Sequence, residues 1–231
     1  MFISILFVML ALAIFSFFFF RKNANIVSVE KQFTPIIFND QSAYLEVSGL
    51  NKDEIGQTVL NEINTSKVKN GGLEGIYPTV NQQIVGLREF ISLIKSNFTP
   101  SNDLSLVSDN FLMGVVKNPD TQTNTGTGFF ILLKVRSIAD IFDSMRLWEN
   151  NLLTDLHGFL GVNISSDTNY LFTKNFIDGI VENKNARVLY DNSGNIVLMY
   201  IFADDNSVII TDSSNAAHEI LLRLASSQVQ Q

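Results

Sequence analysis

The chain has 231 residues, of which 46% are hydrophobic and 19 are Phe. A chain of this length and apolar content can build a packed core, which excludes a disordered tail. The sequence contains no Cys, so a disulfide scaffold, a thiolate zinc site and a cysteine nucleophile are excluded. Its formal net charge is −7, and an acidic chain without basic clusters predicts no nucleic-acid partner.

The first predicted element is an uncharged apolar stretch. Residues 2–20 carry no charged side chain, and a helix of this length rises about 28 Å, close to the ~30 Å of hydrocarbon in a bilayer. The stretch predicts a transmembrane signal-anchor helix over residues 1–21 that contacts the lipid bilayer through residues 2–20. Ala11-Leu12-Ala13 has the small-x-small form of a signal-peptidase site, so cleavage stays an alternative.

The folded part is predicted to begin near Ala43. Residues 22–42 contain Pro35 and show no helical periodicity, which predicts an extended stalk. Residues 43–160 are predicted to form a first α+β part with two strand-strand-helix units. Residues 161–231 are predicted to form a C-terminal meander followed by a helix.

Two helix starts are marked by capping boxes. Asn51 is followed three residues later by Glu54, and Ser137 is followed at the same spacing by Asp140. A side-chain oxygen at the first of these positions accepts a hydrogen bond from an otherwise unpaired amide of the first turn. Helices are therefore predicted to begin directly after Asn51 and Ser137.

One pattern recurs three times, two or more strands followed by a helix. Short turns join the strands, which predicts a mainly antiparallel sheet. The helices are expected to pack on one face of that sheet, as in an α+β fold. Residues 129–135 are apolar at nearly every position, which predicts a central strand buried on both sides. The three helices of the repeated units are predicted at residues 86–98, from Ser137 onward, and at 213–225.

The residue types that most often carry catalysis or bind metals do not cluster. The two His, His157 and His218, each lack a second His at ligand spacing. Gly126 and Gly128 precede a predicted strand and not a helix, so they indicate a hairpin loop and not a phosphate loop. Residues 191–195 predict a hairpin turn. The sequence therefore predicts no catalytic, cofactor-binding or metal-binding residue.

Trp148 is the one candidate site residue. It is the only Trp in the sequence and lies off the main apolar stripe of its predicted helix. The favoured interpretation is a half-buried packing residue. The alternative is an anchor in the interface with a protein partner, because Trp is enriched among the residues that dominate binding energy.

The order of motifs along the chain resembles a protein family. After the span and the stalk come "NFLMGVV", "GFFILLKVRSIADIFDSMRLWENNLLTDL" and "FIDGIVENKNARVLYDNSGNIVLMYIF", and the chain closes with "LLRLASS". In this order the motifs are similar to a family of uncharacterised single-pass membrane proteins of candidate phyla radiation (Patescibacteria-type) bacteria. The resemblance covers nearly the whole chain and carries no catalytic signature. Members often have a charged, proline-rich tail ahead of the span, which implies a domain outside the cytoplasm.

These features predict a single-pass protein of the cell membrane. Its extracytoplasmic domain is expected to be non-catalytic and to bind a protein partner at the cell envelope. The alternative is an envelope enzyme or a small-ligand receptor whose site is built from dispersed residues. A concave pocket with a strongly shifted carboxyl pKa favours the alternative, whereas an exposed apolar patch around Trp148 favours protein binding.

Overall fold

The computed structural model of the chain describes residues 35–99, 106–118 and 126–228. Residues 32–231 belong to one compact unit. The predicted transmembrane helix and the predicted stalk up to residue 34 lie outside the described residues. Of the helices in the described part, none is long and apolar enough to span a membrane.

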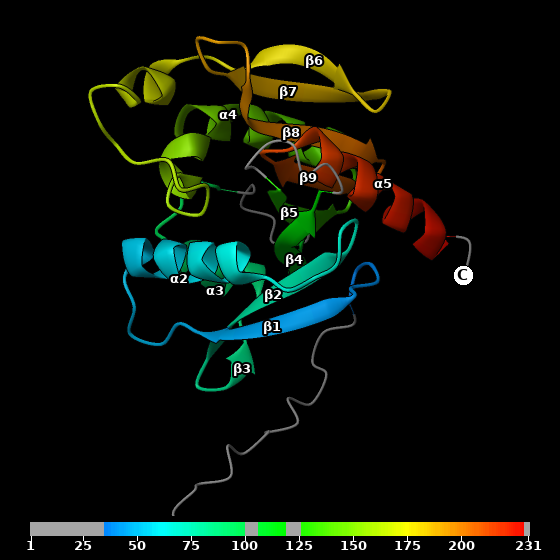
Figure 1. Cartoon of the computed structure of the whole chain (residues 1–231). Coiled ribbons are helices and arrows are strands. Elements are labelled where there is room, and N and C mark those ends of the chain that lie inside the picture. Colours follow the sequence, from blue (N-terminus) through cyan, green and yellow to red (C-terminus); the bar gives the residue numbers. More distant parts are fainter. Residues whose placement is uncertain (1–34, 100–105, 119–125, 229–231) are drawn as a thin grey trace, which may run out of the picture. The chain divides into compact units, whose positions relative to one another are not determined.

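A nine-stranded sheet runs through the unit (Figure 1). Its strand order is β1-β2-β4-β5-β9-β8-β7-β6, and the short strand β3 pairs with β2 outside this order. Strands β1 and β2 are parallel and the other described pairs are antiparallel, so the predicted mainly antiparallel α+β fold is confirmed. The strands are β1 (Gln41–Glu46), β2 (Leu73–Val80), β3 (Gln83–Ile84), β4 (Val107–Lys117), β5 (Thr127–Val135), β6 (Ile177–Val181), β7 (Lys184–Tyr190), β8 (Ile196–Asp204) and β9 (Ser207–Thr211).

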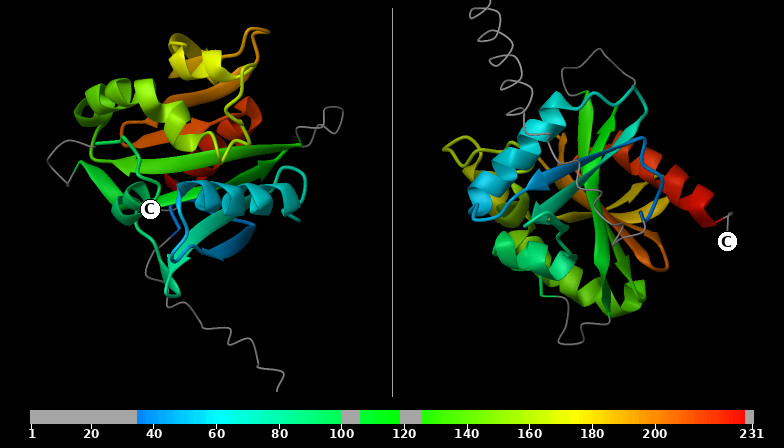
Figure 2. Two further views of the ribbon diagram at one scale, coloured as in Figure 1. Left: turned by 90° about the vertical axis from the view of Figure 1, so that its left-hand side faces the viewer. Right: turned by 90° about the horizontal axis from the view of Figure 1, so that it is seen from below.

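Helices cover both faces of this sheet (Figures 1 and 2). Helices α2 (Lys52–Thr65), α3 (Leu87–Leu93) and α4 (Ile138–Leu156) lie on one face, and α5 (Ser214–Gln228) lies on the other. The prediction that all helices pack on one face is therefore wrong. The physical reason is that β4, β5, β8 and β9 are apolar on both sides, so both faces of the sheet must be covered.

Strand β5 lies in the middle of the sheet and illustrates this requirement. Phe129, Ile131 and Leu133 belong to the core beneath α2, α3 and α4. Phe130 and Leu132 belong to the core beneath α5, because successive side chains of a strand point to opposite faces. The prediction of a central strand buried on both sides is confirmed.

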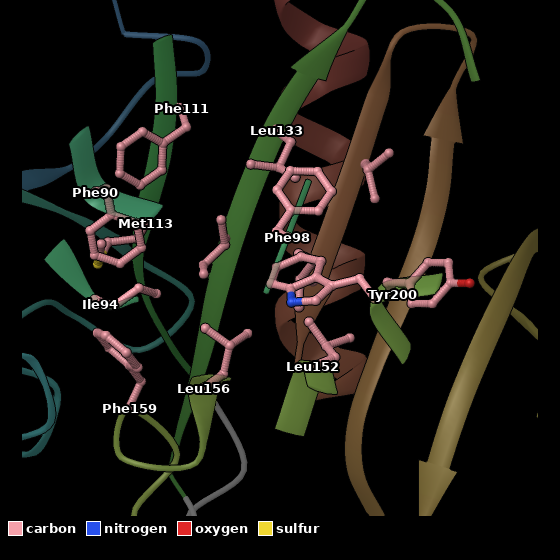
Figure 3. Close-up of a cluster of buried hydrophobic side chains, with 14 of the residues drawn as sticks. Phe90, Ile94, Phe98, Phe111, Met113, Leu133, Leu152, Leu156, Phe159 and Tyr200 are labelled. Carbon is pink, nitrogen blue, oxygen red and sulfur yellow. The ribbon is translucent and has the colours of Figure 1, made fainter. Parts of the chain in front are cut away.

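The larger core lies between the sheet and the layer of three helices (Figure 3). Phe90 of α3 stacks on Phe111 of β4 with ring centroids 5.2 Å apart, and meets the ring of Phe159 edge-on at 5.9 Å. Helix α2 approaches the end of α4 through Gly56, where a Cβ would lie only 3.2 Å from the carbonyl carbon of Gly158. Gly56 therefore permits a close contact between α2 and the turn after α4, because a larger residue at this position would push the Gly158 backbone away.

Both predicted helix starts are confirmed. Asn51 Oδ1 accepts a hydrogen bond from the Glu54 amide at 3.1 Å, and Glu54 Oε2 accepts one from the Asn51 amide at 2.8 Å. Ser137 Oγ accepts one from the Asp140 amide at 3.3 Å. Each cap satisfies amides that the helix itself cannot pair.

Two boundaries differ from those predicted. Helix α3 ends at Leu93 and not at residue 98, because Lys95 adopts a φ of 49°, a left-handed conformation that cannot continue a helix. The folded part begins before Ala43, since β1 starts at Gln41 and Ile37 is buried in the core beneath α5.

The segment between residues 160 and 185 contains two elements. A short 3₁₀ helix, η1, spans Asn169–Thr173, and β6 follows it. Strand β6 pairs with β7 through a turn at Glu182 and Asn183, whose φ angles of 51° and 59° are typical of a tight hairpin. Strand β9 pairs with β5, so one sheet continues across residue 160.

Candidate functional site

A depression of about 1030 Å³ lies where the end of β9 meets the start of α5. We call it the Asp212 pocket. The segment that follows α4, the β7–β8 turn and the first residues of β5 form its other described walls. Hydroxyl and amide side chains supply much of the lining, from Thr127, Asn163, Ser165, Thr168, Tyr170 and Asn195.

Hydrogen bonds on either side fix the backbone at Asp212. The hydroxyl of Thr211 donates to the carbonyl oxygen of Phe129 at 2.6 Å and accepts from the amide of Ser213 at 3.2 Å. Ser213 Oγ accepts from the amide of Ala216 at 3.4 Å, in the first turn of α5. Asp212 is therefore held between the last residue of a central strand and a helix cap.

Gly128 allows β5 to lie against the start of α5. A Cβ at this position would be 2.6 Å from the Cβ of Ser213 and 2.9 Å from the Cβ of Ala216. Any side chain here would push α5 away from β5, and Asp212 with it. Gly128 was predicted to lie in the loop before a strand, and it is the second residue of β5.

Asp212 is the most unusual ionisable group of the pocket. Its Oδ1 atom is buried and has no hydrogen-bond partner among the described residues. Burial raises the pKa of the Asp212 carboxyl to about 7, although the backbone amides of Asp212 and Phe129 act in the opposite direction. The carboxyl therefore changes its charge near neutral pH. Such a shift in a cleft is typical of binding and catalytic groups.

The β7–β8 turn forms a rigid wall of the pocket. Asp191 Oδ1 accepts from the amides of Ser193 at 2.8 Å and Asn195 at 2.7 Å, and its Oδ2 accepts from Asn195 Nδ2 at 2.9 Å. These bonds, with that of the Asn195 side chain foremost, hold the pKa of the Asp191 carboxyl below its usual range. The predicted hairpin turn is confirmed, and the Asp191 carboxylate is engaged within it.

The wall that follows α4 is also fixed by its own hydrogen bonds. Thr168 Oγ1 donates to the carbonyl oxygen of Asn163 at 2.5 Å and accepts from the amide of Ser165 at 3.0 Å. The hydroxyl of Tyr170 accepts from the amide of Asn192 at 3.2 Å, which joins this wall to the β7–β8 turn. The pocket is therefore largely preformed, as ligand sites usually are.

A second polar cluster lies between α4 and the strands β6, β7 and β8. This Arg187 cluster consists of Glu149, Asp178, Arg187 and Tyr200. Arg187 donates to both oxygens of Glu149 at 2.9 and 3.0 Å and to Asp178 at 2.8 Å. The hydroxyl of Tyr200 donates to Glu149 at 2.5 Å. The bonds with Glu149 raise the pKa of Arg187, and burial raises the pKa of Tyr200, so both stay protonated and hold α4 to the sheet.

Trp148, the residue that the sequence offered as a candidate partner interface, lies in the core. Its side chain is 5% exposed, and its ring centroid is 4.4 Å from that of Phe98. Its Nε1 donates a hydrogen bond to Asp155 Oδ2 at 2.7 Å. A partner cannot reach a side chain in this position, so the packing interpretation accounts for Trp148.

Asp155 forms the centre of a third polar cluster. The Asp155 cluster consists of Asp155, Lys52, Ser96, Asn97 and Trp148. Asp155 is fully buried and accepts from Ser96 Oγ at 2.8 Å, from the Asn97 amide at 2.6 Å and from Asn97 Nδ2 at 2.9 Å. Lys52 Nζ lies 3.4 Å from Asp155 Oδ1. The cluster joins α2, α4 and the segment after α3.

Neither His is placed as a metal ligand. His157 Nδ1 lies 3.0 Å from the carbonyl oxygen of Val162, and His218 Nδ1 lies 2.9 Å from Glu182 Oε2. Over residues 35–99, 106–118 and 126–228, no group of three or more His, Cys, Asp or Glu could hold a metal ion. Comparisons of the chain with protein-family models, curated proteins and solved structures find no match.

Proposed function

We propose that this domain is a non-catalytic receptor for a small polar ligand, which binds in the Asp212 pocket. One observation carries the proposal: Asp212 lines the pocket, and its buried oxygen Oδ1 receives no hydrogen bond from the described residues. A buried acceptor without a donor costs about 1–3 kcal/mol. A ligand that donates to this carboxyl would recover that free energy and gain affinity from it.

The other ionisable groups support binding rather than catalysis. Acid–base catalysis by a carboxyl pair requires a second group that is free to give or take a proton. Asp191 also lines the pocket, but its oxygens accept three hydrogen bonds from its own turn. Asp191 is therefore a poor second acid, which favours a binding role for Asp212.

The proposal places the receptor at the cell membrane. Residues 2–20 would anchor it in the lipid bilayer, with the domain outside the cytoplasm. This part rests on the sequence, because residues 2–20 lie outside the described ones. Protease added to intact cells should digest the domain. Protection of the domain under conditions that digest other surface proteins would contradict the extracytoplasmic placement.

Binding of a protein partner at the cell envelope is the second candidate function. It is favoured by two exposed apolar side chains on one face of the sheet: Ile180 of β6 is 77% exposed and Phe142 of α4 is 44% exposed. Ile180 and Phe142 line a hollow of about 600 Å³. Exposed apolar patches often mark interaction sites. This function ranks second because Trp148, its predicted anchor, is buried.

Ligand binding is tested on the full chain in lipid nanodiscs. A library of small polar metabolites is screened by ligand-observed NMR and by shifts of the thermal midpoint. Asp212→Asn should remove the hits, whereas Asp143→Asn should keep them, because Asp143 is an exposed residue of α4 that does not line the pocket. Hits that persist in Asp212→Asn, or a screen without hits, would contradict the receptor proposal.

A further inference from the structure

We infer that the ligand of the Asp212 pocket is a small polyhydroxylated amine, bound as a cation. This inference rests on the proposed receptor function and names the chemical class of its ligand. Three properties of the pocket lead to it: the sign of its charge, the missing donor at Asp212 and the hydroxyl and amide groups of its walls.

The charge of the lining has a single sign. Asp167, Asp191 and Asp212 contribute carboxyl groups, and the described lining residues include no Lys, Arg or His. Lys174 lies outside the lining, beside the β7–β8 turn, where its Nζ donates to the carbonyl oxygen of Asp191 at 3.0 Å and to Asn192 Oδ1 at 3.4 Å. Its one positive charge faces the three carboxyl groups of the lining. A concave surface lined by one sign of charge attracts the opposite sign and repels its own. The lining therefore selects cations over anions.

The missing donor at Asp212 selects an amine over a neutral ligand. An alcohol can donate one hydrogen bond to the carboxyl, whereas an ammonium group has three donors and also carries the opposite charge. Hydrogen bonds between charged partners are roughly twice as strong as those between neutral ones. A bound ammonium would also favour the ionised form of this carboxyl, whose pKa burial raises to about 7.

The N-terminus of α5 acts against this preference. A helix N-terminus carries roughly half a positive charge, which favours anions. Ser213 Oγ already accepts the amide of Ala216 in that first turn. The lining contributes three carboxyl groups against this one partial positive charge. The carboxyl groups of the lining thus remain the dominant charges.

The rest of the lining fits a frame that carries hydroxyl groups. Hydroxyl and amide side chains each combine donors and acceptors, which is what a polyol requires. Apolar side chains lie among them and can pack against the carbon atoms of such a frame. The apolar lining residues are Leu160, Val162, Leu171, Ile196 and Val197.

Three probes of one carbon frame separate charge from shape. Glucamine (1-amino-1-deoxysorbitol), sorbitol and gluconate differ at one terminal group, which is cationic, neutral or anionic. Each is titrated by NMR into the full chain in uncharged nanodiscs at about pH 7.5, where the amine is protonated and Asp212 is mostly ionised. We expect glucamine to bind about tenfold more tightly than sorbitol, and gluconate to bind most weakly.

The outcomes separate this inference from the receptor proposal. Binding of sorbitol as tight as that of glucamine, or a preference for gluconate, overturns the amine assignment and leaves a receptor for polar ligands. If none of the three probes binds, the amine assignment is overturned too, and the metabolite screen then decides the receptor proposal by itself.

Two matched variants locate the effect. Asp212→Asn should weaken glucamine binding about tenfold and leave sorbitol binding within about twofold, because only the charged bond is lost. Asp143→Asn removes the same charge from the exposed side of α4 and should change neither affinity. An equal loss in both variants would show diffuse attraction to a chain of net charge −7, and would overturn the site. A thermal unfolding transition retained in both variants confirms that they fold.

Discussion

The Asp155 cluster and the Asp212 pocket both enclose a carboxyl group, and they differ in what surrounds it. Asp155 accepts hydrogen bonds from Trp148, Ser96 and Asn97. Asp212 Oδ1 has no partner within the described part of the chain, and burial raises the pKa of that carboxyl to about 7. A buried polar group with all its partners stabilises a fold, whereas one without them marks a candidate site for a ligand.

Asp155 and Asp212 also differ in their positions in the fold. Asp155 lies among three segments of one helical layer, so it contributes to the packing of α2, α4 and the segment after α3. Asp212 lies at the end of β9, where one central strand gives way to α5 and a depression opens. Changes at Asp155 should therefore lower stability, whereas changes at Asp212 should alter how stability depends on pH.

Removal of the Asp155 carboxyl should have the largest effect. Asp155→Ala leaves Trp148 Nε1 and the Asn97 amide buried without acceptors, at about 1–3 kcal/mol each, and also removes the partner of Lys52. We expect the free energy of unfolding to fall by about 4 kcal/mol. Urea unfolding followed by Trp148 fluorescence measures it. A loss below about 1 kcal/mol would contradict the structural role of this cluster.

The Arg187 cluster provides a second partnered carboxyl, that of Glu149, and the two arginines that contact Glu149 allow an internal control. Arg187→Met leaves Glu149 with 11% of its side chain exposed and without its main partner, so we expect a loss of about 3 kcal/mol. Arg146 also contacts Glu149, at 3.4 Å, but its own side chain is 42% exposed. Arg146→Met should therefore cost less than about 0.5 kcal/mol. Equal losses in the two variants, again by urea unfolding, would refute the distinction.

Much of this fold is predictable from local patterns. The capping residues Asn51 and Ser137 and the apolar run at 129–135 each depend on neighbours in the sequence, and each was predicted correctly. The same apolar run already argued against helices on one face only, because a strand buried on both sides needs helices or other segments over both faces of the sheet. Strand β6 escaped prediction because its sequence, IDGIV, is short and contains Gly, which is unfavourable within strands.

The candidate site was not predictable in the same way. Asp212 follows a strand and precedes a helix cap, and an Asp in that position has the sequence pattern of any helix start. Its burial depends on Gly128, which lies far away in the sequence and lets β5 approach α5. Trp148 shows the converse, since it is buried by packing against Phe98, a residue of the segment after α3. Exposure and partners of single residues follow from long-range contacts, which sequence patterns do not report.

Asp212 should show an effect of the opposite sign to that of Asp155. The pKa of its carboxyl is about 7 in the folded chain against a usual 3.8, so ionisation opposes folding. The penalty is absent below about pH 4, grows up to about pH 7 and is then constant. Asp212→Asn removes it and should raise the free energy of unfolding by about 2 kcal/mol at about pH 8, allowing for partial exposure of the residue.

Thermal unfolding of Asp212→Asn and of the unmodified chain, measured across this pH range, tests the prediction. The difference between their midpoints should be small near pH 4 and should grow as the pH rises. A constant difference across the range would mean that the Asp212 carboxyl titrates as it does in water, and the contrast with Asp155 would then be lost.

Glu46 should give the smallest effect, and it extends the comparison to the protein surface. Its carboxylate accepts from the hydroxyl of Ser48, from the amide of Asn81 at 3.0 Å and from the amide of Gln82 at 3.2 Å. These bonds, with that of Ser48 foremost and one from Thr79 among the others, lower the pKa of Glu46 to about 2.

The effect of the Glu46 carboxylate on stability is therefore opposite in sign to that of Asp212. Glu46 stabilises the fold above its usual pKa of 4.5, and this contribution is lost as the pH falls towards 2. Glu46→Gln should lower the thermal midpoint at neutral pH by a small amount, because the side chain is exposed and water can replace its bonds. The thermal midpoint of Glu46→Gln should lie below that of the unmodified chain at neutral pH and approach it on acidification. The midpoint of Asp212→Asn should lie above that of the unmodified chain at neutral pH and also approach it on acidification. If both variants instead shift the midpoint with the same sign at neutral pH, then the number of partners around a carboxyl does not decide its contribution in this fold.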